Sequence, residues 1–259
     1  MYAHPRTVKD VNECLFYHSL EIHGLGPING LWNLIGRLDD YIGGVDVKGR
    51  RVLDVGCASG FLSFEMEKRG AEVVSFDAES ARDMDRLPFA KSLYSTNRKR
   101  WEDEFNETID SVKRSYWFAY ERIRSNAKVF YGDIYNLPEE LGSFDVAVIG
   151  QILVHLSDPI SAIGSVGRIC SDTLVITERM LDTEQPIMKL CADPDKGPDW
   201  ARWHLSVGLY RSVLKMMGFG IVKLSEATYE SKHLGPTKLN TIVAKRDPKL
   251  NQGSFLGAW

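Results

Sequence analysis

The residues best suited to chemistry lie in the stretch RVLDVGCASGFLSFEMEKRGAEVVSFD, residues 51–77. Gly56 and Gly60 bracket a turn of small residues, so little side chain separates the backbone from a bound molecule. Asp77 closes the stretch, where a nucleotide site presents a carboxylate to two ribose hydroxyls. We therefore expect a nucleoside to lie against this turn.

The kind of nucleoside depends on the residues around the glycines. A dinucleotide site would have the pattern G-x-G-x-x-G and would hold a pyrophosphate at the start of a helix. This turn instead has Asp54 before Gly56 and Ala58 in the middle. A carboxylate there would repel a pyrophosphate, whereas it suits a cationic nucleoside that carries an amino acid.

The elements that position this turn form a β-α-β unit. Val52, Leu53 and Val55 predict a short buried strand, and residues 61–69 predict a helix. A second strand is expected over residues 72–76. Such a unit implies a parallel sheet with the helix crossing over it.

A second carboxylate follows the next predicted strand, residues 128–131. Asp133 could accept a hydrogen bond from an adenine amino group, while Ile134 packs on the ring. The alternative is that Asp133 only caps a turn or a helix.

A histidine follows the continuous apolar run of residues 144–150, which predicts a central buried strand. Gln151 and the sequence VHLSDP then reach the carboxyl edge of the sheet, where ligands of open α/β sheets bind. His155 could accept a proton from a hydroxyl or amine, or orient it. It could equally hydrogen-bond its own loop.

The remaining pattern completes an alternating α/β chain. Helices are expected over residues 159–169 and 207–217, and strands over residues 173–177, 221–224 and 239–244. Residues 78–126 predict a long amphipathic helical insertion, whose cluster Arg98–Arg100 with the acids after it suits a solvated helix face.

Residues 178–206 predict a lid on the substrate side, with a packed linker as the alternative. Glu178 could orient a substrate from the end of its strand, and Arg202 could anchor a carboxylate or phosphate. Further candidates in this segment are Trp200, Trp203 and His204.

Residues 1–48 lack a sustained helical or strand period, which predicts a loop-rich cap over the site. Its candidates for the lining of a closed site are Tyr17, His18, His23 and Trp32. The alternative is that Trp32 and the histidines pack an N-terminal element on the sheet edge.

Composition limits the classes of partner. The chain has 259 residues, a formal charge of −3 and four separated cysteines, Cys14, Cys57, Cys170 and Cys191. This charge does not favour nucleic acid, and the cysteine spacing suits neither a zinc site nor a disulfide framework. We expect no metal and no membrane span, a small-molecule substrate and a cytoplasmic setting. Nothing in the sequence indicates an oligomeric state.

The turn at residues 54–60 resembles motif I of the class I S-adenosylmethionine-dependent methyltransferases, with Ala58 in place of the middle glycine. The resemblance implies a doubly wound α/β fold with a mostly parallel seven-stranded sheet over residues 49–246, the last two strands forming a hairpin. Residues 247–259 would form a C-terminal tail. The implied cofactor is S-adenosylmethionine, bound by Trp32, Asp54, Gly56, Cys57, Ala58, Gly60, Phe61, Asp77, Ala78, Asp133, Ile134 and Gln151.

Five further motifs resemble the wobble-uridine tRNA carboxymethyltransferase branch and its shorter relatives: HG-x7-W, DVGCASGF, LVHLSDP, LVITERMLD and WHLSVGLYRSVLKMMGF. The basic and tyrosine residues that hold a carboxylated cofactor in that branch are not identified here, and its N-terminal region is longer. We therefore expect plain methyl transfer to an oxygen or nitrogen of a small acceptor by in-line displacement. His155 is the first candidate base, His204 the second, and Tyr17, His18, Arg202 and Trp203 would face substrate. A tRNA-modifying enzyme and a non-catalytic cofactor-binding domain are the alternatives.

Overall fold

The computed structural model describes residues 1–22, 24–84, 89–193, 195 and 201–250, and its centre is an eight-stranded sheet. The strand order is β3-β11-β12-β8-β7-β4-β5-β6. Neighbours from β8 to β6 are parallel, and β12, β11 and β3 are antiparallel to their neighbours. The strands are β3 (Trp32–Asn33), β4 (Arg51–Val55), β5 (Glu72–Asp77), β6 (Lys128–Tyr131), β7 (Phe144–Gly150), β8 (Cys170–Glu178), β11 (Phe219–Ser231) and β12 (Gly235–Arg246).

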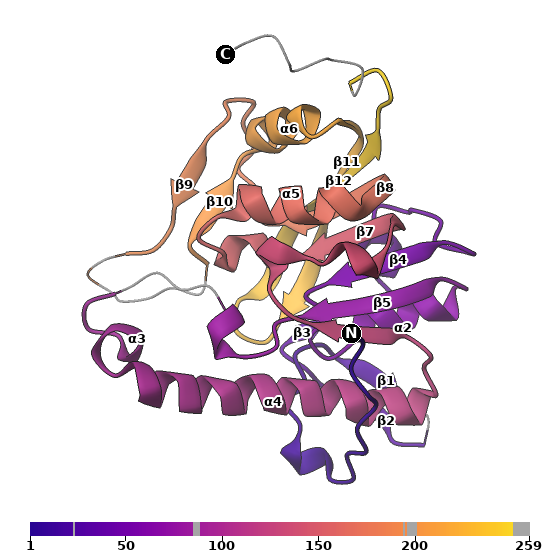
Figure 1. The fold of residues 1–259 in the computed structure, drawn as a ribbon, viewed down its shortest axis with the longest axis vertical. Coiled ribbons are helices and arrows are strands. Elements are labelled where there is room, and N and C mark those ends of the chain that lie inside the picture. The colour runs from indigo at the N-terminus through magenta and orange to yellow at the C-terminus, as the bar shows by residue number, and fades with distance from the viewer. Residues whose placement is uncertain (23, 85–88, 194, 196–200, 251–259) are drawn as a thin grey trace.

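Helices cover both faces of this sheet (Figure 1). On one face lie α2 (Phe61–Lys68), α4 (Arg98–Ile123) and the hairpin of β1 (Leu20–Ile22) and β2 (Gly26–Ile28); on the other lie α5 (Pro159–Ile169) and α6 (Val207–Met216). The other elements are α1 (Leu38–Tyr41), α3 (Leu93–Thr96), the two-stranded ribbon of β9 (Met188–Leu190) and β10 (Trp203–Leu205), and the 3-10 helices η1 (Val11–Glu13), η2 (Ala81–Asp83), η3 (Ile134–Asn136), η4 (Glu139–Leu141) and η5 (Leu153–His155).

The central strands are apolar because both of their faces are covered. In β7, Val146, Ala147, Val148 and Ile149 have no exposed surface, and they alternate between two hydrophobic clusters, one on each face of the sheet. The order of the strands reverses between β4 and β7, which pair with each other in parallel. This switch point, at the carboxyl ends of the two strands, is where open α/β sheets bind ligands.

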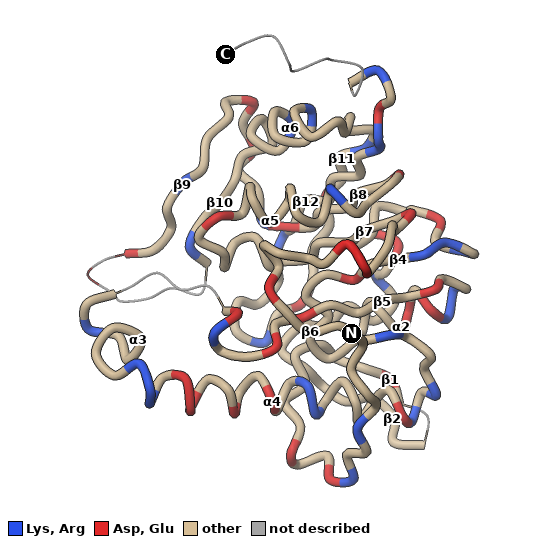
Figure 2. Tube along the Cα trace, in the orientation of Figure 1, with Lys and Arg blue, Asp and Glu red and all other residues tan. Residues whose placement is uncertain are grey.

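The helical insertion is mainly α4, which has 26 residues. The Asn97 side chain accepts a hydrogen bond from the amide of Arg100 and caps the start of the helix. Its first turns carry ion pairs of residues four apart, such as Lys99 with Asp103, and Figure 2 shows charge of both signs along it. The predicted solvated face is therefore confirmed, and the opposite face buries Tyr116 and other apolar residues in the core.

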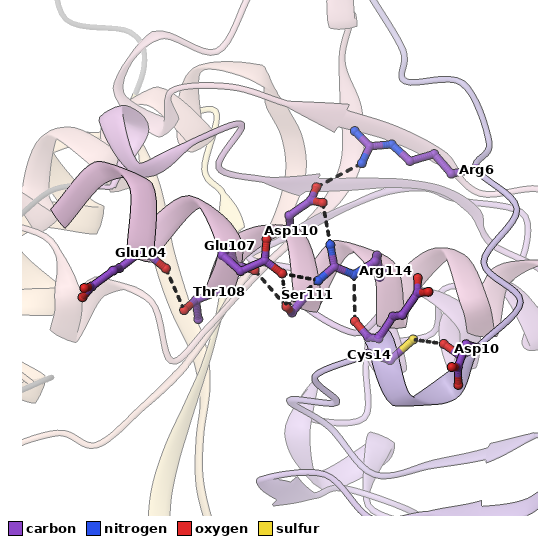
Figure 3. Close-up of polar contacts among 10 residues, drawn as sticks. Arg6, Asp10, Cys14, Glu104, Glu107, Thr108, Asp110, Ser111 and Arg114 are labelled. Carbon is purple, nitrogen blue, oxygen red and sulfur yellow. Dashed lines mark hydrogen bonds and ion pairs between the residues drawn. The ribbon is translucent and has the colours of Figure 1, made fainter. Parts of the chain in front are cut away.

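Residues before the sheet are fixed to α4 by polar contacts (Figure 3). The Arg114 guanidinium donates to the backbone oxygen of Glu13 at 2.7 Å and pairs with Asp110 at 2.8 Å. Arg6 reaches the same carboxylate from the N-terminal segment at 3.1 Å. The cap therefore packs as part of the molecule, and Phe16 and Leu20 lie in the main core cluster.

The predicted doubly wound α/β fold is confirmed, including the closing antiparallel hairpin. The sheet has eight strands rather than the expected seven, because β3 pairs with the end of β11. The expectation of a loop-rich N-terminal segment was wrong in part, because this segment forms β1, β2 and β3. Each has at most three residues, too few to produce a visible alternation. The hairpin strands, at 13 and 12 residues, are also much longer than expected.

Within the described residues, no helix is long and apolar enough to cross a membrane. The same part of the chain holds no group of three or more His, Cys, Asp or Glu side chains arranged to bind a metal ion.

Candidate active site

The glycine-lined turn joins the end of β4 to the start of α2 and lies against the end of β5. The amides of Gly56 and Cys57 both donate to the backbone oxygen of Phe76, at 2.9 and 3.0 Å. Gly56 has a φ of 81° and Gly60, which caps α2, a φ of 86°, backbone conformations that favour glycine. Ala58 has the same handedness with a φ of 45°. The turn thereby brings its backbone beside Asp77.

Asp77 is held in place by the backbone on both sides of it. One carboxylate oxygen accepts the amide of Ala58 and the other that of Ala78, both at 2.8 Å. A carboxylate offers about four acceptor positions. Two serve the amides and the Cys57 thiol approaches Oδ2 at 3.9 Å as a weak donor, so acceptor capacity remains for a ribose. Burial raises the pKa of Asp77, while the two amides and the nearby Lys113 act to lower it. The predicted ribose acid thus has a fixed position at the end of its strand.

Asp54 lies deeper, beneath the turn, and has no exposed surface. Its Oδ2 accepts the hydroxyl of Ser63 at 2.5 Å, and a chain of hydroxyls continues through Ser75 to Tyr116. Its Oδ1 has no hydrogen-bond partner among the described residues, and burial raises the pKa of the carboxyl to about 7. An unused buried acceptor beside a glycine turn suits a ligand that brings hydrogen-bond donors or positive charge, as a sulfonium nucleoside with an amino-acid tail does.

The N-terminal cap is attached directly to this turn. The amide of Tyr17 donates to the hydroxyl oxygen of Ser59 at 2.6 Å, and the hydroxyl of Ser115 on α4 donates to the same atom at 2.9 Å. The Trp32 side chain forms a hydrogen bond with the Tyr17 hydroxyl. Burial raises the pKa of this hydroxyl, and the nearby carboxyl groups of Glu178 and Asp77 raise it further. Tyr17 and Trp32 thus come together over the switch point of the sheet.

Ser59 supplies a test of this attachment. Ser59→Ala should lower the free energy of unfolding by about 2 kcal/mol, because the amide of Tyr17 loses its partner, while Ser115 keeps the oxygen of Val112 as acceptor. Urea unfolding measures the difference, with Ser212→Ala on the exposed side of α6 as the matched control. Equal stability of the two variants would show that the cap does not depend on Ser59.

His18 takes a structural position. It is 7% exposed, its ring lies 6.3 Å from that of Phe61 in α2, and burial lowers its pKa to about 4. The ring is therefore neutral near pH 7. The ring packs against Phe61 of α2, and the expectation that His18 faces substrate stays a prediction. His23 lies outside the described residues.

Asp133 lies at the end of β6, the strand next to that of Asp77. It caps η3 by accepting the amide of Tyr135 at 2.9 Å and the side-chain amide of Asn136 at 2.6 Å. Capping, one of the two predicted roles, is thus present, and the carboxylate still has acceptor positions for an adenine amino group. Ile134 beside it is 5% exposed within the second core cluster.

The loop after β7 is organised by Glu178. This side chain has no exposed surface, and its Oε1 accepts the amide of Leu153 at 2.9 Å, at the start of the 3-10 turn that ends in His155. Burial raises the pKa of Glu178 to about 8. The structure therefore places Glu178 under the loop that carries His155, a role that the sequence did not reveal. Gln151, with a φ of 54°, begins this loop.

The segment predicted to form a lid contains the β9–β10 ribbon, and its Arg202 is held by contacts within the protein. Arg202 is 3% exposed, its amide donates to the oxygen of Val154 at 2.7 Å and its guanidinium to Ser157 at 3.3 Å. Arg202 thus connects the ribbon to the loop that carries His155, and its predicted role as a carboxylate or phosphate anchor stays a prediction. Trp203 beside it is half-buried, and Trp200 lies outside the described residues.

His204 lines a depression of about 460 Å³ beyond the end of β8. The other lining residues are Arg179, Met180, Asp182, Glu226, Lys238 and Asn240. The amide of Arg179 donates to the Gln151 side chain at 3.3 Å, which joins the wall of this depression to the loop after β7. The two candidate bases thus lie on neighbouring elements, and η5 contacts β10.

A glycine turn before a fixed acid, at the switch point of this strand order, defines the class I methyltransferase fold. The chain belongs to the methyltransferase domain family, which its residues 33–207 match. Residues of the chain are 31% identical over 149 positions to ubiquinone biosynthesis O-methyltransferase of Hahella chejuensis, covering 57% of this chain and 47% of that protein. The corresponding protein of Xanthomonas oryzae is 28% identical over 148 positions, covering 57% and 46%. The chain spans about half the length of these curated relatives.

Among solved structures, magnesium protoporphyrin IX methyltransferase of Synechocystis PCC 6803 aligns with a TM-score of 0.53 at 15% identity, covering 83% of this chain and 82% of that one. At this identity the likeness concerns the fold. The Synechocystis enzyme was solved with S-adenosylhomocysteine and with S-adenosylmethionine, the cofactor that the sequence motif implies here. The predicted methyltransferase class is confirmed.

Proposed function

We propose that this protein transfers a methyl group from S-adenosylmethionine to an oxygen or nitrogen of a small-molecule acceptor. The observation that carries the proposal is the fixed carboxylate of Asp77 beside the glycine turn, which retains acceptor capacity beyond its two backbone amides and the weak Cys57 donor. When bound, the cofactor supplies a methyl group on a sulfonium leaving group, so the chain has mainly to bind, orient and exclude water.

Each part of the site then has a task. Asp77 accepts the ribose hydroxyls, and Asp133 with Ile134 receives the adenine. The backbone of the turn and the free oxygen of Asp54 face the amino-acid tail. Tyr17 and Trp32 cover the cleft and keep water from the reacting centre.

The acceptor approaches from the depression beside His204, on the side of Gln151. A hydroxyl acceptor needs to lose its proton as the new bond forms, in an in-line displacement. His155 and His204 are the candidate groups to take this proton, because imidazole titrates near neutral pH. Oxygen is the preferred target, since the curated relatives are named as O-methyltransferases.

The test begins with calorimetry of S-adenosylhomocysteine binding to the whole chain. Micromolar binding, followed by transfer of labelled methyl from S-adenosylmethionine to members of a panel of phenols, catechols and carboxylic acids, is the expected result. Absence of binding would refute the proposal. Binding without transfer to any acceptor class, phenols, amines or RNA included, would instead favour the non-catalytic domain.

A second acceptor class is tRNA, which is supported by the resemblance of five motifs to the wobble-uridine branch. A gel shift with bulk tRNA at physiological salt, weakening steeply as salt is added, would favour it. The net charge of −3 argues for the small molecule. Tighter binding of a carboxylated S-adenosylmethionine than of S-adenosylmethionine itself would indicate that the protein uses the carboxylated cofactor.

A further inference from the structure

One buried cation near the site has no role in the proposed function. Lys113 lies on α4 and is 8% exposed, which is rare for lysine unless its charge is paired. Its ammonium donates to the backbone oxygen of Glu79 at 2.5 Å and lies 4.1 Å from the centre of the Tyr131 ring. Its charge also interacts with that of Asp77, two residues before Glu79. The side chain thus reaches from the insertion helix to the strand ends that would hold the nucleoside.

The same helix holds the loop after Asp77 at a second point. Asn106 accepts the amide of Ala81 at 2.8 Å through its side-chain oxygen. Asn106 and Lys113 are seven residues apart, which is about two helical turns, so they lie on one face of α4. Two side chains of this face therefore form hydrogen bonds with the backbone of residues 79–81, directly after Asp77.

The titratable groups around Asp77 come from five parts of the chain: the glycine turn, β4, β6, the N-terminal cap and α4. The thiol of Cys57 lies 3.9 Å away in the glycine turn, and Asp54 lies beneath it. Tyr131 approaches from β6, and Tyr17 from the cap. When ionised, each of these groups is negative, whereas Lys113 brings positive charge from α4. Without it, a buried carboxylate would keep its proton to a higher pH.

We propose that Lys113 is a positioning residue for cofactor binding: it fixes the loop after β5 and keeps the Asp77 carboxylate ionised, so that Asp77 accepts both ribose hydroxyls. This inference rests on the proposed function. The helical insertion is then part of the nucleoside site, although it lies outside the β-α-β unit that defines the family's first motif.

The experiment is calorimetry of S-adenosylhomocysteine binding between pH 5 and 8.5, for the wild type and for Lys113→Met. Methionine keeps the length and the apolar stem of the side chain and removes the charge. The affinity of the wild type should fall at acid pH, as Asp77 takes up a proton. In Lys113→Met this fall should begin at a higher pH, so that binding at pH 6 weakens severalfold more than binding at pH 8.5 does.

Two further variants separate charge from shape. Lys113→Arg keeps the charge and should return the pH profile toward that of the wild type. Lys99→Met, on the exposed side of the same helix, should leave the profile unchanged. Because burial raises the pKa of Asp54 to about 7, the comparison is repeated with Asp54→Asn, where the shift caused by Lys113→Met should persist.

The outcomes are distinct. The inference is overturned if Lys113→Met binds with the same affinity as the wild type. It is also overturned if the affinity is reduced by the same factor at every pH, because this result would show a purely structural role. Failure of the wild type to bind S-adenosylhomocysteine overturns the proposed function and this inference with it.

Discussion

Asp77→Ala should weaken S-adenosylhomocysteine binding by about 100-fold or more. The substitution removes an ionised acceptor for two ribose hydroxyls, and hydrogen bonds to a charged group contribute roughly 1.5–3 kcal/mol each. It also leaves the amides of Ala58 and Ala78 without their partner, so the turn loses part of its fixed shape. Calorimetry with the purified variant measures the change.

Two variants accompany this measurement. Asp77→Asn keeps the size of the side chain and one acceptor oxygen, and it should bind with intermediate affinity. Asp103→Ala removes an exposed carboxylate of α4 and should bind like the wild type. An unchanged affinity of a folded Asp77→Ala protein would refute the assignment of the ribose to this acid.

Glu178→Gln should make the protein more stable in alkaline solution. Burial raises the pKa of Glu178 from 4.5 to about 8 in the folded chain, so the folded state binds its proton more tightly than the unfolded state. The stability that depends on this proton is present below pH 4.5 and is lost as the pH rises to about 8. Glutamine can still accept the amide of Leu153 and does not titrate. At pH 8.5 the variant should exceed the wild type by about 4–5 kcal/mol.

Urea unfolding at several values between pH 5 and 9 measures this difference. Glu140→Gln, at an exposed position, is the matched control and should follow the wild type at every pH. Parallel stability curves for Glu178→Gln and the wild type would mean that the carboxyl is ionised in the folded protein.

The elements that the sequence predicted well are those whose pattern is local. The β-α-β unit has a buried strand, a glycine turn and a helix within residues 51–77, and the structure places all three within one residue of the expected bounds. The helix over Pro159–Ile169 was also correct, because Asp158 caps it and proline begins it.

The features that were missed depend on residues far apart in the chain. Arg202 has the side chain of an anion anchor, and only the fold shows that it is buried against Val154 and Ser157. Ser59 looked like a small residue of the turn, yet it holds Tyr17, 42 residues earlier in the chain. The spacing of apolar residues in the sequence does not predict such contacts, because they depend on how the cap and α4 pack on the sheet.

The long strand β11 contacts both the N-terminal cap and the depression beside His204. Its last residue, Ser231, pairs with Trp32 of the cap, while Glu226, five residues earlier and about 17 Å along the strand, lines the depression beside His204. Backbone hydrogen bonds to β12 along this length make the ribbon stiff. Under the proposed function, the segment over the cofactor site and the wall of the acceptor depression therefore contact the same strand, so a shift of β11 would move both together.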